Sequence, residues 1–214
     1  MEYFSHIEGD CDIAMVDYAK RNSPTGICTW HENGLDHVLR YYNKNSKRVA
    51  LDIGASYGFF TTGLAQNFKT VHSFEINPSV IPHLKINTSN YSNVNIHEYG
   101  LSDIEKSVLI LDGTHSGFVK ISDKGNVQSK VKTIDSFNFK DIDFIKMDVE
   151  GHEYEVFKGG VNTITINRPV IMFEWHTNRG YEDETKRQWV FNFLYNLNYR
   201  FMDYRHNDFL FIPN

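Results

Sequence analysis

The stretch from Arg48 to Phe60, RVALDIGASYGFF, constrains the fold of this chain more than any other. An almost unbroken apolar run leads into its turn, made of Val49, Ala50, Leu51 and Ile53. Such a run is typical of a strand buried on both faces of a parallel sheet. Beyond Gly54 and Gly58, apolar residues recur at helical spacing, at Phe60, Leu64 and Phe68. The sequence therefore predicts strand, tight turn and helix, the first unit of an α/β fold.

The turn itself is a candidate nucleotide site. A helix start offers unpaired N–H groups, and glycines let a ligand approach the backbone closely. The dinucleotide fingerprint requires glycine at its third and sixth positions, but Ser56 and Phe59 stand there. A second predicted strand, residues 70–74, ends at Glu75, about 20 residues after the turn, where an acid accepts hydrogen bonds from ribose hydroxyls. This pattern indicates a nucleoside ligand without a pyrophosphate.

The rest of the chain alternates between predicted strands and helices. Apolar runs predict strands at residues 94–97, 107–111, 127–134, 143–147, 169–173, 199–204 and 208–212. Asn77 and Pro78 are typical of a helix start, and Thr185 with Gln188 forms a capping-box pattern before another apolar helix. We expect an N-terminal helical extension over residues 1–46, with a helix near 35–42, and one domain over residues 47–214.

Acids and histidines follow two of these strands. They are Asp148, Glu150, His152, Glu174 and His176. The carboxyl ends of parallel strands form the edge where such sheets bind their ligands. We therefore predict these five as catalytic candidates. A positioned base that removes a hydroxyl proton adds on the order of a hundredfold to ten-thousandfold in rate.

Several motifs together resemble one family. LDIGASYGFFT, FEINP, YGLSD, DFIKMDVEGHEYEVFKGG and PVIMFEWH are similar, in order and spacing, to motifs of the FkbM family of S-adenosylmethionine-dependent methyltransferases. The resemblance spans Arg48 to about His176, and Ser56 departs from the family's usual asparagine. It implies a Rossmann-like, doubly wound and mostly parallel seven-stranded sheet whose last strand is antiparallel.

The resemblance also implies S-adenosylmethionine as cofactor and a set of residues around it. That set is Asp52, Gly54, Ala55, Ser56, Tyr57, Gly58, Phe60, Thr61, Glu75, Ile76, Leu101, Ser102 and Asp148. We assign Asp148 to the cofactor's amino group or to the acceptor, and Glu150 or His176 to proton removal. Asp52, inside an apolar strand, is expected to organise the glycine turn through hydrogen bonds rather than to touch the cofactor.

Simpler interpretations stay open for several of these residues. Glu150 and Gly151 also fit a helix cap, and His152 in a first helical turn also fits a solvent-facing position. Asp148, Glu150, His152 and Glu174 offer ligands for a magnesium-like ion. The resemblance does not require a metal, and none is expected.

Composition narrows the possible partners. The net charge of −5 provides no electrostatic footprint for nucleic acid, and no apolar run is long enough to span a membrane. The two cysteines, Cys11 and Cys28, and a polar, acidic N-terminus favour the cytoplasm. We expect a small-molecule or glycan acceptor and no nucleic-acid or membrane partner.

The functional hypothesis is methylation of a hydroxyl oxygen on a sugar, glycan or small natural product. The alternative is a catalytically inactive module that keeps the nucleotide pocket and binds a glycan or protein partner. A nicotinamide-dependent oxidoreductase is disfavoured by the missing glycines. The acceptor, transfer to oxygen or nitrogen, and the oligomeric state stay open.

Overall fold

The computed structural model describes residues 47–111, 120–175, 183–205 and 208–214. The predicted N-terminal extension over residues 1–46, with its helix near 35–42, lies outside the described residues, as does His176. Among the helices described, none is long and apolar enough to cross a membrane.

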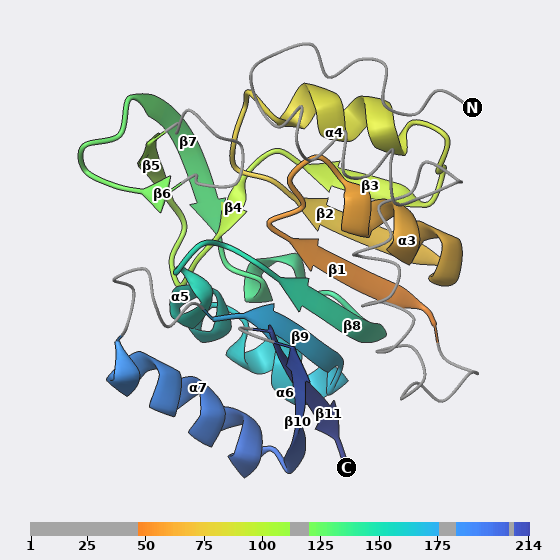
Figure 1. Ribbon diagram of the computed structural model, residues 1–214, viewed down its shortest axis with the longest axis vertical. Coiled ribbons are helices and arrows are strands. Elements are labelled where there is room, and N and C mark those ends of the chain that lie inside the picture. Colours follow the sequence, from red (N-terminus) through yellow and green to blue (C-terminus); the bar gives the residue numbers. More distant parts are fainter. Residues whose placement is uncertain (1–46, 112–119, 176–182, 206–207) are drawn as a thin grey trace.

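Seven strands form the main sheet. They are β1 (Val49–Ile53), β2 (Thr70–Phe74), β3 (Val94–His97), β8 (Ile142–Met147), β9 (Val170–Glu174), β10 (Tyr199–Arg205) and β11 (Asp208–Pro213). Their order is β10-β11-β9-β8-β1-β2-β3 (Figure 1). The pairs from β3 to β9 are parallel, whereas β11 runs antiparallel to both β9 and β10. The predicted doubly wound, mostly parallel sheet with an antiparallel last strand is confirmed.

Helices cover both faces of this sheet. They are α3 (Phe59–Asn67), α4 (Ile81–Thr88), α5 (Glu153–Lys158), α6 (Val161–Asn167) and α7 (Glu184–Asn196). Side chains alternate along β1, so Ala50 packs in a core cluster with Leu64 of α3, while Leu51 packs in the other cluster. That second cluster includes residues of α5, α6 and α7, namely Phe157, Ile164 and Leu194. Because both faces are buried, β1 and β8 read as continuous apolar runs.

A second, smaller sheet takes the place of a crossover helix between β3 and β8. Its strands are β4 (Gly100–Leu101), β5 (Lys106–Leu111), β6 (Lys120–Ile121) and β7 (Val127–Lys132), in the order β4-β7-β5-β6. It projects from one side of the main sheet and encloses its own cluster of Val108, Ile110 and Val131 (Figure 1). The sequence predicted two of its strands but not a separate sheet.

Two predicted helix starts are wrong. Asn77 and Pro78 form a turn ahead of α4, in which the Asn77 carbonyl accepts hydrogen bonds from the backbone N–H groups of Val80 and Ile81. The expected capping box does not begin α7 either. Instead the Asp183 carboxylate accepts hydrogen bonds from the N–H groups of Thr185 at 3.0 Å and Lys186 at 3.2 Å.

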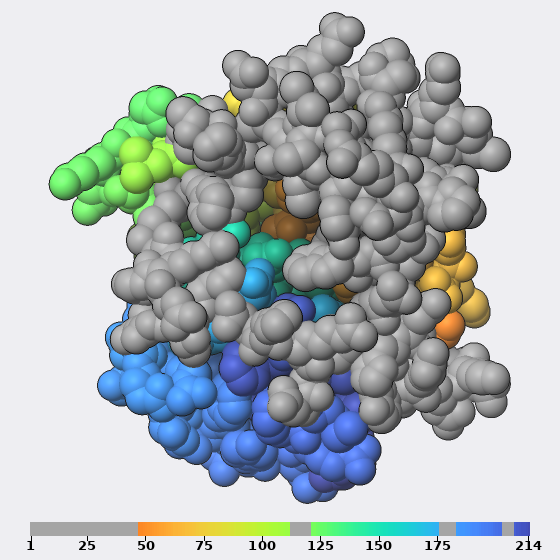
Figure 2. All heavy atoms as spheres, in the orientation of Figure 1, coloured from red at the N-terminus to blue at the C-terminus, as the bar shows by residue number. Residues whose placement is uncertain are grey.

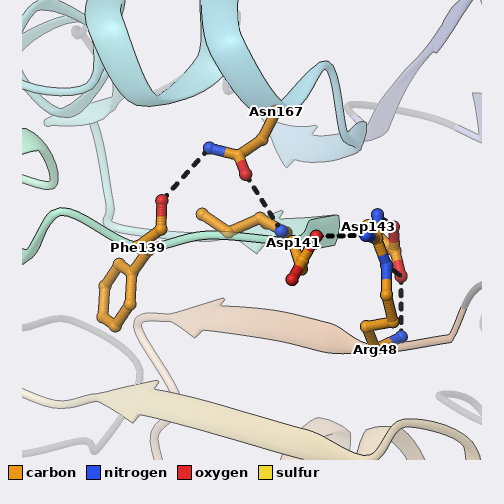
Figure 3. A network of polar contacts seen from close by, with 6 residues as sticks. Arg48, Phe139, Asp141, Asp143 and Asn167 are labelled. Carbon is orange, nitrogen blue, oxygen red and sulfur yellow. Dashed lines mark hydrogen bonds and ion pairs between the residues drawn. The ribbon is translucent and has the colours of Figure 1, made fainter.

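Polar contacts tie β1 to β8 at the amino edge of the sheet (Figure 3). The Arg48 guanidinium donates to the carboxylate of Asp143 from Nε at 3.1 Å and from Nη2 at 2.7 Å, and the Arg48 backbone N–H donates to it at 2.6 Å. Arg48 also bonds the exposed carboxylate of Asp141, and the Asn167 amide accepts from the N–H of Ile142 and donates to the carbonyl of Phe139. This network lies at the opposite end of the strands from the predicted site.

Candidate active site

The site is built around the turn that follows β1. Gly54 has φ of +79°, and a Cβ there would lie 1.8 Å from the carbonyl oxygen of Asp148. The N–H groups of Gly54 and Ala55 both donate to the Phe74 carbonyl at the end of β2, each at 3.0 Å. Gly58, with φ of +84°, then leads into α3. Only glycine at position 54 lets the ends of β1, β2 and β8 come together so closely.

Glu75 lies directly beneath this turn. Its carboxylate is 7% exposed and accepts hydrogen bonds from the N–H of Ser56 at 2.7 Å and from the N–H of Asn77 at 2.8 Å. Burial raises the pKa of Glu75, and these two hydrogen bonds oppose that shift. A carboxylate offers about four lone-pair sites, so capacity for ribose hydroxyls remains.

Asp52 is fully buried on the α3 face of β1. Its Oδ2 accepts a hydrogen bond from the Thr61 hydroxyl of α3 at 2.5 Å, and Thr61 in turn contacts the Ser73 hydroxyl at 3.1 Å. Its Oδ1 is buried with no hydrogen-bond partner among the described residues. Burial raises the pKa of Asp52, and the charge of Lys146 opposes the shift. These contacts join the end of β1 to the first turn of α3.

Two acids meet at the ends of β8 and β9. Burial raises the pKa of Glu174 to about 8, and the charge of Asp148 and a hydrogen bond with its side chain act in the same direction. Two carboxyl groups this close cannot both ionise readily, so they titrate as a pair that holds one proton near neutral pH. The predicted candidates Asp148 and Glu174 are therefore brought together.

His152 contacts a different part of the site. Its Nε2 lies 2.9 Å from the Ser102 hydroxyl, just beyond β4, and its Nδ1 lies 3.6 Å from Glu155. Burial lowers the pKa of His152, although Glu155 acts against this. The structure thus places His152 beside the Leu101–Ser102 segment rather than in the acid pair.

The turn before α5 is held by a residue that the sequence did not single out. Glu150 and Gly151 both have positive φ, and the N-cap of α5 is His152, so the interpretation of Glu150 and Gly151 as a helix cap is wrong. Glu153 is buried, and its Oε1 accepts hydrogen bonds from the N–H groups of Val149 at 3.1 Å and Gly151 at 3.3 Å.

Lys146 is the second residue that sequence reasoning missed. It lies in β8, is 8% exposed, and its ammonium is 3.2 Å from the Gly54 carbonyl and 3.5 Å from the Asp148 carboxylate. Burial favours a lower pKa for Lys146, but the charges of Asp148 and Asp52 hold its pKa above the ordinary value. The available signal was a lysine inside the apolar run DFIKM.

The remaining predicted cofactor residues fall into two groups. Ile76 packs against Gly100, and Ser102 donates from its N–H to the Lys132 carbonyl at 2.8 Å, so these residues line the start of the small sheet. Phe60 belongs to the core, where its ring stacks on Phe144 at 6.3 Å between centroids. Tyr57 is buried too. The first group lies at the small sheet, whereas core packing accounts for Phe60.

Figure 2 shows a hollow near the centre of one face, where atoms in the colours of β1, β8 and the C-terminal strands are visible.

Within the part of the chain that is described, no group of three or more His, Cys, Asp or Glu side chains lies close enough to hold a metal ion.

Comparisons with known proteins agree with this geometry. A family model described as the methyltransferase FkbM domain matches residues 52–201. The curated hexuronic acid methyltransferase AglP of Haloferax volcanii is 30% identical over 149 residues, which are 64% of this chain and 60% of that protein. This chain therefore spans about 60% of the length of that relative.

Solved structures share the fold. A methyltransferase FkbM from Methylobacillus flagellatus KT superposes with a TM-score of 0.55 at 20% identity, over 78% of this chain and 44% of that one. The Streptococcus mutans protein SMU.1697c, solved in complex with SAH, superposes with a TM-score of 0.51 at 13% identity, over 84% of this chain and 94% of that one.

Proposed function

The chain belongs to the FkbM methyltransferase family, and from that premise we propose that it transfers the methyl group of S-adenosylmethionine to a hydroxyl oxygen of a sugar. One observation carries the proposal. The matched region contains Gly54, Glu75, Asp148 and Glu174, which all lie at the carboxyl edge of neighbouring strands. In open parallel sheets this edge binds the ligand.

The described residues fit the cofactor. The positive-φ glycines Gly54 and Gly58 remove the side chain at two positions of the turn. Glu75 is held by two backbone N–H groups and keeps acceptor capacity for ribose hydroxyls. Ile76 follows Glu75 directly and packs against Gly100 at the start of β4, so we propose that Ile76, Leu101 and Ser102 border the adenine. When bound, S-adenosylmethionine supplies an electrophilic methyl group on a sulfonium sulfur.

The acid pair suits the handling of the acceptor's proton. A hydroxyl is a poor nucleophile until its proton is removed, and a positioned base assists that removal. Burial and the neighbouring Asp148 raise the pKa of Glu174 to about 8, so an ionised Glu174 is a stronger base than an ordinary glutamate. We assign proton acceptance to this pair, and Glu150 and His176 stay as predicted candidates.

A sugar acceptor is supported by the name of the relative, a hexuronic acid methyltransferase. We extend this only to the class of acceptor, a carbohydrate hydroxyl, and propose the cytoplasm as the location because two cysteines in the whole chain suit a reducing compartment.

Calorimetry tests the cofactor half of the proposal. We expect S-adenosylmethionine and S-adenosylhomocysteine to bind at micromolar strength and NAD not to bind. Glu75→Ala should weaken both adenosyl ligands at least about tenfold, because a charged acceptor of ribose hydrogen bonds contributes on the order of 1.5 to 3 kcal/mol. The matched control is Glu98→Ala, which removes a half-exposed glutamate paired with Lys85.

Release of S-adenosylhomocysteine in the presence of uronic acids and neutral hexosides tests the acceptor half, and mass spectrometry of the product separates oxygen from nitrogen transfer. If the folded wild-type protein binds neither adenosyl ligand, the methyltransferase proposal fails and the binding-module alternative replaces it. Tight cofactor binding without turnover on any hydroxylated acceptor would favour an inactive module as well.

A further inference from the structure

Lys146 belongs to a polar row inside an apolar face of the sheet. The parallel register pairs Asp52 of β1 with Lys146 of β8 on one side and with Ser73 of β2 on the other. Residues paired in this way point to the same face, which here is the α3 face that also carries Ala50 and Phe144. The row places Lys146 beside the buried Asp52 in an otherwise apolar part of the core.

The ammonium of this lysine contacts the ends of both β1 and β8. Besides Gly54 and Asp148, its Nζ lies 3.9 Å from Asp52 Oδ1 and 5.8 Å from the centre of the Phe60 ring. The Lys146 side chain is 10% exposed and that of Asp52 is fully buried. The Lys146 ammonium therefore contacts the glycine turn, Asp52 in β1 and Asp148 at the acceptor edge.

The geometry is not that of a simple structural salt bridge. Burying two ions costs several kcal/mol each and is repaid only by close, well-aligned contacts. At 3.9 Å the contact with Asp52 is too long for a hydrogen bond, and Asp52 Oδ1 has no other partner among the described residues. The shortest contact of the ammonium is with the Gly54 carbonyl, at 3.2 Å.

We propose that Lys146 is a positioning residue, whose ammonium holds the Gly54 carbonyl and lies between the carboxylates of Asp52 and Asp148, so that the shape of the cofactor turn and the arrangement of the acids at the acceptor edge are set together. The inference rests on the proposed function, because it takes the Gly54 turn as the cofactor site. Lys146 acts through the turn and the acids and need not touch the cofactor.

Four acids face this ammonium, namely Asp52 from β1, Glu75 after β2, Asp148 after β8 and Glu174 on β9. The charge of Lys146 lowers the pKa of Asp52 and of Glu75 against the effect of burial. Without the ammonium both buried carboxyl groups take up protons at higher pH. Glu75 then loses acceptor capacity as the pH falls.

The experiment compares Lys146→Met with the wild type and with Lys158→Met. Lys158 is an exposed lysine on α5, with its ammonium 4.8 Å from the Trp189 ring. Calorimetry measures S-adenosylhomocysteine binding at about pH 6 and about pH 8, both above the ordinary pKa of a carboxyl group. Burial and loss of the ammonium shift the pKa of Asp52 and of Glu75 toward these pH values. We expect Lys146→Met to bind at least about tenfold more weakly near neutral pH, with the deficit growing toward pH 6, while the control follows the wild type.

A purely structural lysine gives another result. If Lys146→Met melts at a lower temperature but binds S-adenosylhomocysteine like the wild type at both pH values, the inference is overturned and the proposed function stands. If the wild type itself does not bind, the proposed function falls and takes the inference with it.

A double variant that removes both charges controls for the case in which Lys146→Met alone does not fold. Asp52→Asn combined with Lys146→Met leaves no unpaired buried charge in this pair, and neutral replacements of buried ion pairs are often tolerated. We expect this double variant to bind at least about tenfold more weakly than Asp52→Asn alone, because the tether to Gly54 is lost. Equal affinity in the two would overturn the inference.

Discussion

Glu153 illustrates how one side chain determines the backbone beside it. Its buried carboxylate accepts hydrogen bonds from the backbone N–H groups of Val149 and Gly151 in the turn before α5. That turn carries Asp148 and Glu150, so Glu153 supports the acceptor edge without lying at it. Burial raises the pKa of Glu153 to about 7, which leaves it partly protonated at neutral pH.

This shift makes stability depend on pH. The folded-state pKa of about 7 lies above the ordinary value of 4.5, so the folded state binds the proton more tightly than the unfolded state. The stabilisation is complete below about pH 4.5 and is lost as the pH rises through about 7. We expect the melting temperature of the wild type, measured relative to Glu153→Gln, to fall between about pH 5 and about pH 8.

Melting curves across that pH range make the test. Glu174 titrates in both the wild type and Glu153→Gln, so its effect cancels in the difference between their melting temperatures. Glu105→Gln, at an exposed position, serves as the control. Parallel curves for wild type and Glu153→Gln would contradict the assignment of Glu153 as the titrating group.

At this scale the sequence predicted some residues and not others. Asp52 was predicted because an acid inside an apolar strand is unusual, and Glu75 because it ends the second strand about 20 residues after the glycine turn. For Lys146 the sequence offers only a lysine inside an apolar run, and the register of β1 against β8 then shows that it lies beside Asp52. Glu153 looks like any acid in a first helical turn, and only the positive φ of Glu150 and Gly151 reveals what its carboxylate does.

Among the elements, α7 depends on a side chain that lies before its first residue. Val190 and Leu194 of α7 are buried in the core cluster, and the N-cap Asp183 satisfies two of the helix's first N–H groups. We expect Asp183→Ala to cost about 1 kcal/mol of unfolding free energy, since replacing such a cap by alanine costs about 0.5 to 2 kcal/mol.

Urea unfolding of Asp183→Ala and Thr185→Ala separates the observed cap from the predicted capping box. Thr185 contributes its backbone N–H to the cap, which alanine preserves, so Thr185→Ala should lie within about 0.5 kcal/mol of the wild type. A larger loss of unfolding free energy for Thr185→Ala than for Asp183→Ala would contradict the Asp183 cap and favour the predicted capping box.

Strands were predicted better than helix ends and connections. The predicted bounds of β2 and β3 match the structure at both ends. Helix ends depend on which polar side chain folds back, as Asp183 does, and spacing alone does not identify it. The second sheet was missed because its short strands β4 and β6 have two residues each.

The whole molecule separates stability from chemistry along the strand direction. At the amino edge Arg48 clamps Asp143, and at the carboxyl edge the glycine turn meets the acids. We expect Asp143→Ala to lower the unfolding free energy by about 2 to 3 kcal/mol, because it removes charge-assisted hydrogen bonds from a buried carboxylate. Affinity for S-adenosylhomocysteine should stay within about twofold of the wild type, because the change lies at the far end of β8.

Asp141→Ala is the matched control for this prediction. Asp141 bonds the same guanidinium, but its side chain is 61% exposed, so its loss should cost about 1 kcal/mol or less. Unfolding in urea measures the unfolding free energy, and calorimetry measures the affinity for S-adenosylhomocysteine. A large loss of ligand affinity in folded Asp143→Ala would show that the two edges are not independent.

The small sheet between β3 and β8 also bears on how this protein can diverge. A crossover helix must keep its apolar stripe matched to the main sheet, whereas this hairpin-based sheet packs Val108, Ile110 and Val131 against one another. Its hairpins can lengthen, shorten or change their outer face while the residues of the main sheet stay the same. Evolution can therefore remodel the strands that follow Leu101 and Ser102, from β5 to β7, and leave the inherited chemistry intact.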